Sequence, residues 1–418
     1  MTCPRAAGAL LLLGALFALA ACDNPTNVGD ELVGGEDAGP ERVVLRPGAG
    51  LDVDTARYAP ETGTSVPGEI DVARFLAGQQ EAGAPLGNVE ATGYFDVGRI
   101  GAPSELDALT IDSVTVDLVV NYAYGSTSEP ITVSLHDLAE EWEANNAPAD
   151  TTFDSGFAER QTITTFSAAP GDTLSVSLPQ RWIREHESEL RTVGDTAFGG
   201  AFHGFQVRAA GGSGVVGFAS SSTRMRVIYE SPSGQEERPI ARYRLTEQLT
   251  TVRSSGRASS DDQRALVQDG IGRALSIELA PPDSLRGVAV NNATLVLEAD
   301  TAASGLPETF MRPTLEQLEL RNGPDDDEGD DLPRGRFLTF NEEEARFESN
   351  FALRNVVQPV LNDAADFGEI QLRPPPRLVQ VRRQNIPVPV PSLNSALIRL
   401  DEGHEPRLEL VYTPINEE

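Results

Sequence analysis

The chain has 418 residues, 64 of them acidic and 33 basic, so its formal net charge at pH 7 is −31. Every basic residue is an arginine, which excludes Schiff-base chemistry and lysine general bases. Such an acidic chain repels nucleic acid and other polyanions unless arginines cluster locally, so we expect no nucleic-acid partner.

A secretory signal peptide is expected over residues 1–21, because one positive charge precedes a short apolar run with no charge on its far side. The run ends in Leu19, Ala20, Ala21 and Cys22, which resembles the lipobox of bacterial lipoproteins. That resemblance implies cleavage before the cysteine and acylation of it by fatty acids such as palmitate. The alternative is ordinary secretion, which would leave Cys22 a free thiol. We expect a cell-envelope protein, anchored by lipid in the outer membrane or at the cell surface rather than in the inner membrane.

The remaining cysteine, Cys3, lies within the signal, so the mature body would contain no thiol for disulfides, thiolate metal sites or nucleophiles. Residues 22–42 begin with small, polar and acidic residues and are predicted to form a flexible tether. We expect the membrane to be a partner only through the N-terminal lipid.

Beyond the tether, apolar and polar residues alternate in short segments, as in antiparallel sheets with one buried face. Val114, Val116 and Leu118 follow this pattern, and so do Leu295 and Leu297. The 38 glycines and 29 prolines also favour an all-β body with many turns.

The order of predicted elements in the first half of the body recurs in the second half, and each half closes with a strand that ends in a tyrosine, Tyr229 or Tyr412. This repetition predicts two copies of one unit. We expect an all-β fold of two tandem jelly-roll-like antiparallel β-sandwiches, which span residues 43–235 and 236–418.

Each half also contains one predicted short helix. Residues 353–361 have helical spacing of apolar side chains, although Pro359 must end or kink the helix. In the first half, Leu178, Trp182 and Leu190 lie roughly on one helical face.

The first half resembles the DNRLRE, or disaggregatase-related, β-sandwich domain. The resemblance lies in Leu138 and Trp142 after a short strand, Trp182 in a helix, and Val227 with Tyr229 in a closing strand. The whole plan, from lipobox to closing strand, is similar to uncharacterised surface lipoproteins of Bacteroidetes-type bacteria. This resemblance implies an extracytoplasmic β-sandwich module, and it supplies no catalytic residues.

Two further segments suggest ligand chemistry. The stretch from Gly212 through Gly214 to Gly217 satisfies a dinucleotide-binding pattern, but a strand pattern follows it, so a glycine-rich hairpin turn is favoured. In the acidic run 324–333, Asp325, Asp327 and Asp331 are a weak calcium candidate whose spacing differs from that of an EF-hand loop. A solvated, self-repelling loop is the favoured interpretation.

The two tryptophans, Trp142 and Trp182, could stack on sugar rings if exposed, or fill the core where helix meets sheet, which is favoured. The four histidines are dispersed, and we expect them at the surface or at strand edges, without a metal site. The proline-rich segment 373–391 could be an extended recognition strip, although a surface-crossing connection is favoured.

These observations predict a non-enzymatic, lipid-anchored envelope protein that binds a glycan or another envelope protein, without a cofactor. The alternative is a polysaccharide-active hydrolase or a glycan-binding component of such a system. A close acid pair in a cleft, flanked by exposed aromatic rings, would favour the hydrolase.

Overall fold

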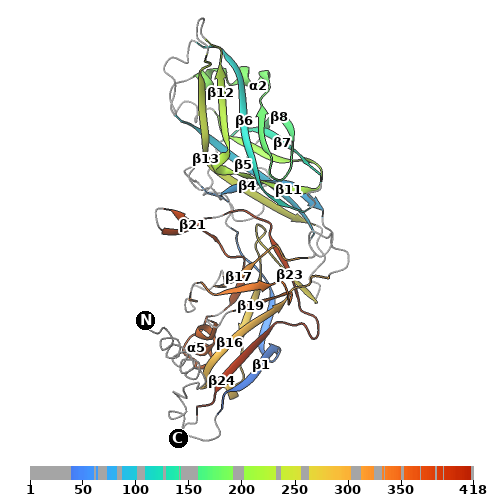
Figure 1. Cartoon of the computed structure of the whole chain (residues 1–418), viewed down its shortest axis with the longest axis vertical. Coiled ribbons are helices and arrows are strands. Elements are labelled where there is room, and N and C mark those ends of the chain that lie inside the picture. The colour runs from blue at the N-terminus through green and yellow to red at the C-terminus, as the bar shows by residue number, and fades with distance from the viewer. Residues whose placement is uncertain are drawn as a thin grey trace, which may run out of the picture.

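The structure is a computed structural model. It describes residues 39–60, 63–64, 73–81, 87–100, 109–125, 129–140, 142, 159–191, 202–231, 237–255, 263–302, 312–323, 332–333, 335–349, 353–367, 369–381, 384–388 and 390–415. These residues form an all-β protein with two large sheets that lie end to end along the long axis of the molecule (Figure 1). The predicted all-β class is confirmed.

One sheet is made from both ends of the chain, and we call it, with helix α5 (Arg354–Leu361), the base unit. A pairing between β2 and β15 closes nine of its strands into a barrel-like ring. Its strands are β1 (Glu41–Pro47), β2 (Gly50–Arg57), β14 (Arg264–Gln268), β15 (Arg273–Leu279), β16 (Ala289–Glu298), β17 (Gln317–Asn322), β18 (Phe337–Asn341), β19 (Arg346–Ser349), β20 (Ile370–Arg373), β23 (Ser395–Arg399) and β24 (Arg407–Thr413).

The other sheet lies between β2 and β14 in the chain, and we call it, with helices α2 (Gln180–Glu185) and α3 (Glu187–Arg191), the inserted unit. A pairing between β13 and β5 adds to its main strand order. Its strands are β3 (Gly63–Thr64), β4 (Arg74–Glu81), β5 (Asn88–Ile100), β6 (Ile111–Tyr124), β7 (Ile131–Leu138), β8 (Glu159–Ala168), β9 (Thr173–Ser177), β10 (Phe205–Gly211), β11 (Gly214–Ala219), β12 (Arg224–Tyr229) and β13 (Ile240–Ser255).

The alternating segments form strands as predicted, because their apolar faces line the two cores. Val114, Val116 and Leu118 of β6 are fully buried in the inserted unit, and Leu295 and Leu297 of β16 are buried in the base unit. The strands that contain the two repeated tyrosines have equivalent partners: β12, which ends at Tyr229, pairs antiparallel with β6, and β24, which contains Tyr412, pairs antiparallel with β16.

The predicted helices are also present. Pro359 lies within α5, two residues before its end, while Val356, Val357 and Leu361 face the base-unit core. Gln358 ties this helix to the sheet, since its amide nitrogen donates to the Val288 carbonyl oxygen at 2.8 Å. In the inserted unit, Leu178, Trp182 and Leu190 are all buried.

The sheets do not follow the predicted division at residues 235 and 236. Strands β1 and β2 belong to the base unit, and β13 belongs to the inserted unit. The reason is long-range pairing: Glu41 is opposite Tyr412 in the β1–β24 ladder, and Ile240 is opposite Ile228 in the β12–β13 ladder. The ladders run as one continuous strand order in each unit, so they show the all-β class but do not by themselves define two facing layers.

The glycine-rich stretch is a turn, but the predicted hairpin is wrong. Gly212, with a φ of 85°, follows β10, and Gly214 begins β11, yet these strands pair with other strands and not with each other. A Cβ at Gly212 would lie 3.2 Å from the Cα of Ile131, so the turn presses closely on β7. Gly214 and Gly217 lie within strand β11 and not at the start of a helix, which excludes the dinucleotide motif.

The proline-rich segment contains a two-stranded antiparallel hairpin, β21 (Arg377–Val381) and β22 (Gln384–Val388), separate from both large sheets (Figure 1). Pro387 is opposite Leu378 in this pair. Regular β pairing of this kind differs from a polyproline-type recognition strip.

Candidate functional site

The lipobox-like residues Leu19, Ala20, Ala21 and Cys22, together with the tether up to residue 38, lie outside the described residues. So do Asp325, Asp327 and Asp331 of the calcium candidate. Lipidation and calcium binding therefore stay predictions. In the part of the chain that is described, no group of three or more histidine, cysteine, aspartate or glutamate side chains could hold a metal ion.

Neither tryptophan presents a ring face for a sugar, so the glycan-stacking interpretation is wrong for both. Trp182 is 1% exposed, and its ring stacks on His186 with the centroids 4.3 Å apart. Trp142 is 7% exposed, and its Nε1 donates a hydrogen bond to the His203 carbonyl oxygen at 2.8 Å. Trp182 lies in α2 and fills the inserted-unit core, and Trp142 packs against Tyr94, Leu138 and Leu249 of three strands.

The prediction that the histidines lie at the surface or at strand edges is wrong for His136, which is 1% exposed on β7 between β8 and β10. It is also wrong for His186, which forms a buried ion pair with Asp137. Its Nε2 lies 3.2 Å from Oδ2 of Asp137, and the two side chains are 4% and 1% exposed. Its Nδ1 lies 3.0 Å from the Trp182 carbonyl oxygen, so both ring nitrogens lie near acceptors, which favours the imidazolium form. Burial by itself lowers the pKa of His186, but its contacts with Asp137 and the Trp182 carbonyl outweigh burial and raise the pKa above its ordinary value.

A catalytic relay does not arise from this pair. The hydroxyl of Ser134 lies 2.7 Å from Nε2 of a different histidine, His136, whose Nδ1 faces Thr162 at 3.3 Å. Asp137 contacts His186 and Ser134 contacts His136, so serine, histidine and aspartate do not form one chain. The His186–Asp137 pair is better suited to holding α2 against β7 than to catalysis.

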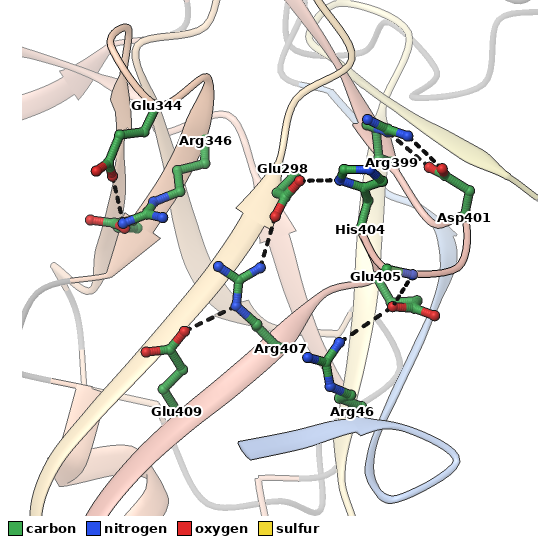
Figure 2. A network of polar contacts seen from close by, with 12 residues as sticks. Arg46, Glu298, Glu344, Arg346, Arg399, Asp401, His404, Glu405, Arg407 and Glu409 are labelled. Atoms are coloured by element: carbon green, nitrogen blue, oxygen red, sulfur yellow. Dashed lines mark hydrogen bonds and ion pairs between the residues drawn. The ribbon is translucent and has the colours of Figure 1, made fainter. Parts of the chain in front are cut away.

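A second histidine–carboxylate pair lies near the surface of the base unit. Figure 2 shows Glu298 between His404 and Arg407, with Arg407 also contacting Glu409. Burial raises the pKa of Glu298, but the hydrogen bonds from His404 and Arg407 outweigh it and hold the pKa below its ordinary value. These contacts join β16, β24 and the turn that precedes β24.

The same network continues to the ends of neighbouring strands. Arg399 at the end of β23 binds Asp401, and Arg46 of β1 lies 3.4 Å from Glu405 (Figure 2). On the other side of Glu298, Arg346 of β19 contacts Glu344 (Figure 2). The base unit thus pairs these arginines with acids.

The junction between the two units combines an apolar cluster with hydrogen bonds between distant segments. The turn between β14 and β15 and the segment before β23 pack against the ends of the inserted strands. Its apolar part consists of Leu76, Val89, Ala91, Tyr124, Val215, Val252, Leu266, Ile271, Leu393 and Leu397. Six of these come from the inserted unit and four from the base unit.

Two tyrosines of β6 connect the units by hydrogen bonds. The Tyr122 hydroxyl accepts from the Leu393 backbone N–H at 2.8 Å and donates to Oδ1 of Asn394 at 3.1 Å. The Tyr124 hydroxyl accepts from Nε2 of Gln268 at 2.9 Å. Burial raises the pKa of both phenols, that of Tyr124 to about 12. Both hydroxyls therefore stay protonated at neutral pH. They keep the hydrogen bonds that they accept from Leu393 and Gln268, and Tyr122 keeps the one that it donates to Asn394.

The Asp269 carboxylate organises the base-unit side of the junction. It accepts hydrogen bonds from the Ser392 hydroxyl at 2.5 Å, the Gly270 backbone N–H at 2.8 Å and the Tyr58 hydroxyl at 3.4 Å. Burial raises the pKa of Asp269, and these hydrogen bonds oppose that rise. On the inserted-unit side, the guanidinium of Arg74 on β4 lies over the Tyr122 ring, 4.7 Å from its centroid.

A shallow hollow of about 570 Å³ lies beside the β18–β19 hairpin of the base unit. Its lining is polar and acidic, and the positive φ of 51° at Ala345 closes the hairpin turn. The lining residues are Thr339, Phe340, Asn341, Glu342, Glu343, Glu348 and Ser349.

No protein-family model matches the chain, and no curated protein matches it either. The DNRLRE resemblance therefore stays a prediction. Within the described ranges, no helix is long and apolar enough to cross a membrane.

Sequence reasoning missed the junction and both histidine–carboxylate pairs. A signal was present for one part: Asp269-Gly270 after a buried strand is a common turn sequence, and these residues begin the β14–β15 turn. Nothing in the sequence indicates that Tyr122 is a partner of Asn394, because 272 residues separate them.

Proposed function

We propose that the chain is a lipid-anchored cell-envelope protein that acts as a non-catalytic binding or structural module. The single observation that carries this proposal is the lipobox-like ending Leu19-Ala20-Ala21-Cys22 after an apolar run. The tether after Cys22 leads into β1, so the lipid would join the base unit. The inserted unit would then be held on the far side of the base unit.

The junction supports a presenting role, because it fixes one unit on the other. Separating the units would expose the apolar cluster and would break the hydrogen bonds of Tyr122 and Tyr124. Each hydrogen bond contributes about 0.5–1.5 kcal/mol, and an unsatisfied buried group costs about 1–3 kcal/mol. The chain also passes between the units twice, after β2 and after β13, which limits rotation.

The finer jelly-roll assignment is part of the same proposal. Each closed ladder could be a flattened sandwich whose layers share strands at the corners, as DNRLRE-like domains would require. Register shifts support this interpretation, since bulges let a strand bend from one layer to the other. One lies between Leu245 and Glu247 of β13, and another between Val290 and Asn292 of β16.

Palmitate labelling of Cys22→Ser tests the anchor. We expect the wild-type chain to incorporate label and to sediment with membranes, and the variant to lose both. Cys3→Ser is the matched control, because Cys3 would leave with the signal and its replacement should change neither result. A Cys22→Ser protein that keeps its label and its membrane association would refute the lipid anchor.

The hydrolase alternative would use the hollow beside β18–β19, where Glu342, Glu343 and Glu348 surround Phe340. Paired carboxylates can hydrolyse glycosidic bonds. The test is release of reducing sugar from purified envelope polysaccharide. We expect none above the level of a protein-free control. The hydrolase proposal would be favoured over the binding module if the wild type released sugar, Glu348→Gln did not, and the control Glu409→Gln still did.

A further inference from the structure

Four arginines lie on the solvent face of two neighbouring strands in the inserted unit. Arg224 and Arg226 alternate with buried Met225 and Val227 on β12. On β13, Arg242 and Arg244 alternate in the same way with Ala241, Tyr243 and Leu245, which are buried. We call Arg224, Arg226, Arg242 and Arg244 the arginine quartet.

The strand register places these like charges directly opposite each other. Arg224 is opposite Arg244, and Arg226 is opposite Arg242. Side chains opposite each other on an antiparallel pair have Cβ atoms roughly 5 Å apart, and residues two apart on one strand are about 7 Å apart. Like charges in this arrangement destabilise a sheet. The quartet is therefore an arrangement that packing alone does not favour.

One acidic side chain lies among these arginines, Asp117 of β6, which is opposite Arg224 in the β6–β12 ladder. Asp117 of β6 forms an ion pair with Arg226, with Nε 2.7 Å from Oδ2. Among the residues that the structure describes, no ion pair involves Arg224, Arg242 or Arg244, and all three are exposed. Three guanidinium groups thus face solvent together in a chain of net charge −31.

The remainder of this face is rich in hydroxyl groups. Ser177 of β9 is exposed and is opposite Thr115 of β6, whose own hydroxyl oxygen is covered. Ser175, on the next row, donates to Oδ1 of Asp117 at 2.7 Å. Ile100, opposite Arg242, is the large apolar side chain that is clearly exposed here, at 49%. This surface has too little apolar area for the core of a stable protein interface.

We propose that the arginine quartet binds the carboxylate or sulfate groups of an anionic polysaccharide. Guanidinium groups form bidentate hydrogen bonds with such planar or tripod anions, and neighbouring hydroxyls can bond sugar hydroxyls. At physiological ionic strength the Debye length is about 8 Å, so distant acids on the chain are screened while the quartet acts at contact distance.

The position of the quartet favours a polymer outside the cell over the headgroups of the protein's own membrane. Strands β12 and β13 lie in the inserted unit, whereas β1 lies at the other end of the molecule (Figure 1). This step rests on the proposed lipid anchor next to β1. The binding chemistry does not, because it depends on the quartet alone.

Binding of the full chain in detergent to soluble polymers tests the proposal. The probes are polygalacturonate for carboxylates, dextran sulfate for sulfates, neutral dextran, and polyglutamate as an acidic polypeptide. We expect saturable binding to one or both anionic polysaccharides, weakened by added salt, and none to neutral dextran. Arg224→Gln/Arg242→Gln/Arg244→Gln should raise the Kd at least about tenfold.

The control variant is Arg42→Gln/Arg57→Gln/Arg181→Gln, which removes the same charge from exposed positions elsewhere and should leave the Kd within about twofold. Equal binding by the quartet variant, equal binding of neutral dextran, or binding of polyglutamate alone would overturn the proposal. The melting temperature of the quartet variant separates binding from folding: relief of repulsion should leave it unchanged or raise it, and a clear fall would assign the arginines to structure. Failure of palmitate labelling would leave these results untouched.

Discussion

The two units use the same kinds of element but fill their cores differently. The inserted-unit core is rich in aromatic rings, and Trp182 anchors its helix. The base-unit core is aliphatic apart from Phe347 and Phe367, and valines and a leucine anchor α5. The buried aromatic residues of the inserted core are Phe75, Phe95, Trp182, Phe202, Phe205, Phe218, Tyr229 and Tyr243. A closed β ladder with a short helix can therefore be filled by aromatic or by aliphatic side chains, provided that they occupy the available volume.

The two units also differ in where they place their histidine–carboxylate pairs. The inserted unit buries its histidine–carboxylate pair, His186–Asp137, whereas the base unit holds its pair, His404–Glu298, near solvent. Burial strengthens a charge pair but makes it costly to break, and exposure weakens it. The two units should therefore respond differently to substitution and to pH.

Trp182→Ala should be the most damaging change and should act on the inserted unit. Removal of a buried indole costs about 3–5 kcal/mol of unfolding free energy. Both tryptophans of the chain lie in the inserted unit, so the fluorescence of Trp142 follows that unit during denaturant unfolding, while circular dichroism follows both. If Trp182→Ala unfolds, by Trp142 fluorescence, at the same denaturant concentration as the wild type, then Trp182 does not anchor the helix.

Leu361→Ala is the matched change in the base unit, where it should cost about 2–4 kcal/mol. Its effect should appear in circular dichroism more than in tryptophan fluorescence. If the fluorescence transition shifts as much as the dichroism transition, the units unfold as one and the comparison fails.

Tyr122→Phe should come next, because it removes two hydrogen bonds across the junction. The Leu393 N–H would lose its acceptor and Asn394 its donor, which costs about 1–3 kcal/mol for the unsatisfied buried group. The control is Tyr412→Phe, whose hydroxyl donates to exposed Glu41 and should contribute less than about 0.5 kcal/mol. Small-angle scattering should show a broader distribution of unit separations only in Tyr122→Phe. Equal scattering for both variants would mean that this hydroxyl does not hold the units together.

The sequence predicted what depends on local pattern. Strands β6 and β16 and helix α5 follow from the spacing of apolar residues. The sheet membership of β1 and β13 could not be predicted, because it depends on partners far along the chain. The arginines of β12 and β13 alternate visibly in the sequence, but only the register shows that they face each other.

The buried histidine should make the inserted unit less stable at alkaline pH. Because the pKa of His186 is raised by folding, its contribution is complete below the unfolded pKa of about 6.5 and is lost as the pH rises through the folded pKa. The loss is about 1.4 kcal/mol for each unit of difference between those pKa values. Fluorescence-detected unfolding from pH 6 to pH 9 measures it. Asp137→Asn/His186→Gln removes both partners and should flatten the profile, and an unchanged slope would assign the pH dependence to other groups.

The smallest effect should come from Glu298 in the base unit, and its sign is opposite. Since folding lowers the pKa of Glu298, its contribution is present above the unfolded pKa of about 4.3 and is lost as the pH falls through the folded pKa. Glu298→Gln should therefore cost stability at pH 7 and almost nothing at pH 3. The cost should stay below about 1 kcal/mol and should shrink further in high salt, because solvent screens a pair near the surface. Circular dichroism at the two pH values checks it, with Glu409→Gln as the control that keeps the His404 contact. A loss at pH 3 equal to that at pH 7 would mean that Glu298 acts through packing, and the contrast between a buried pair and a solvent-screened pair would then not describe these two units.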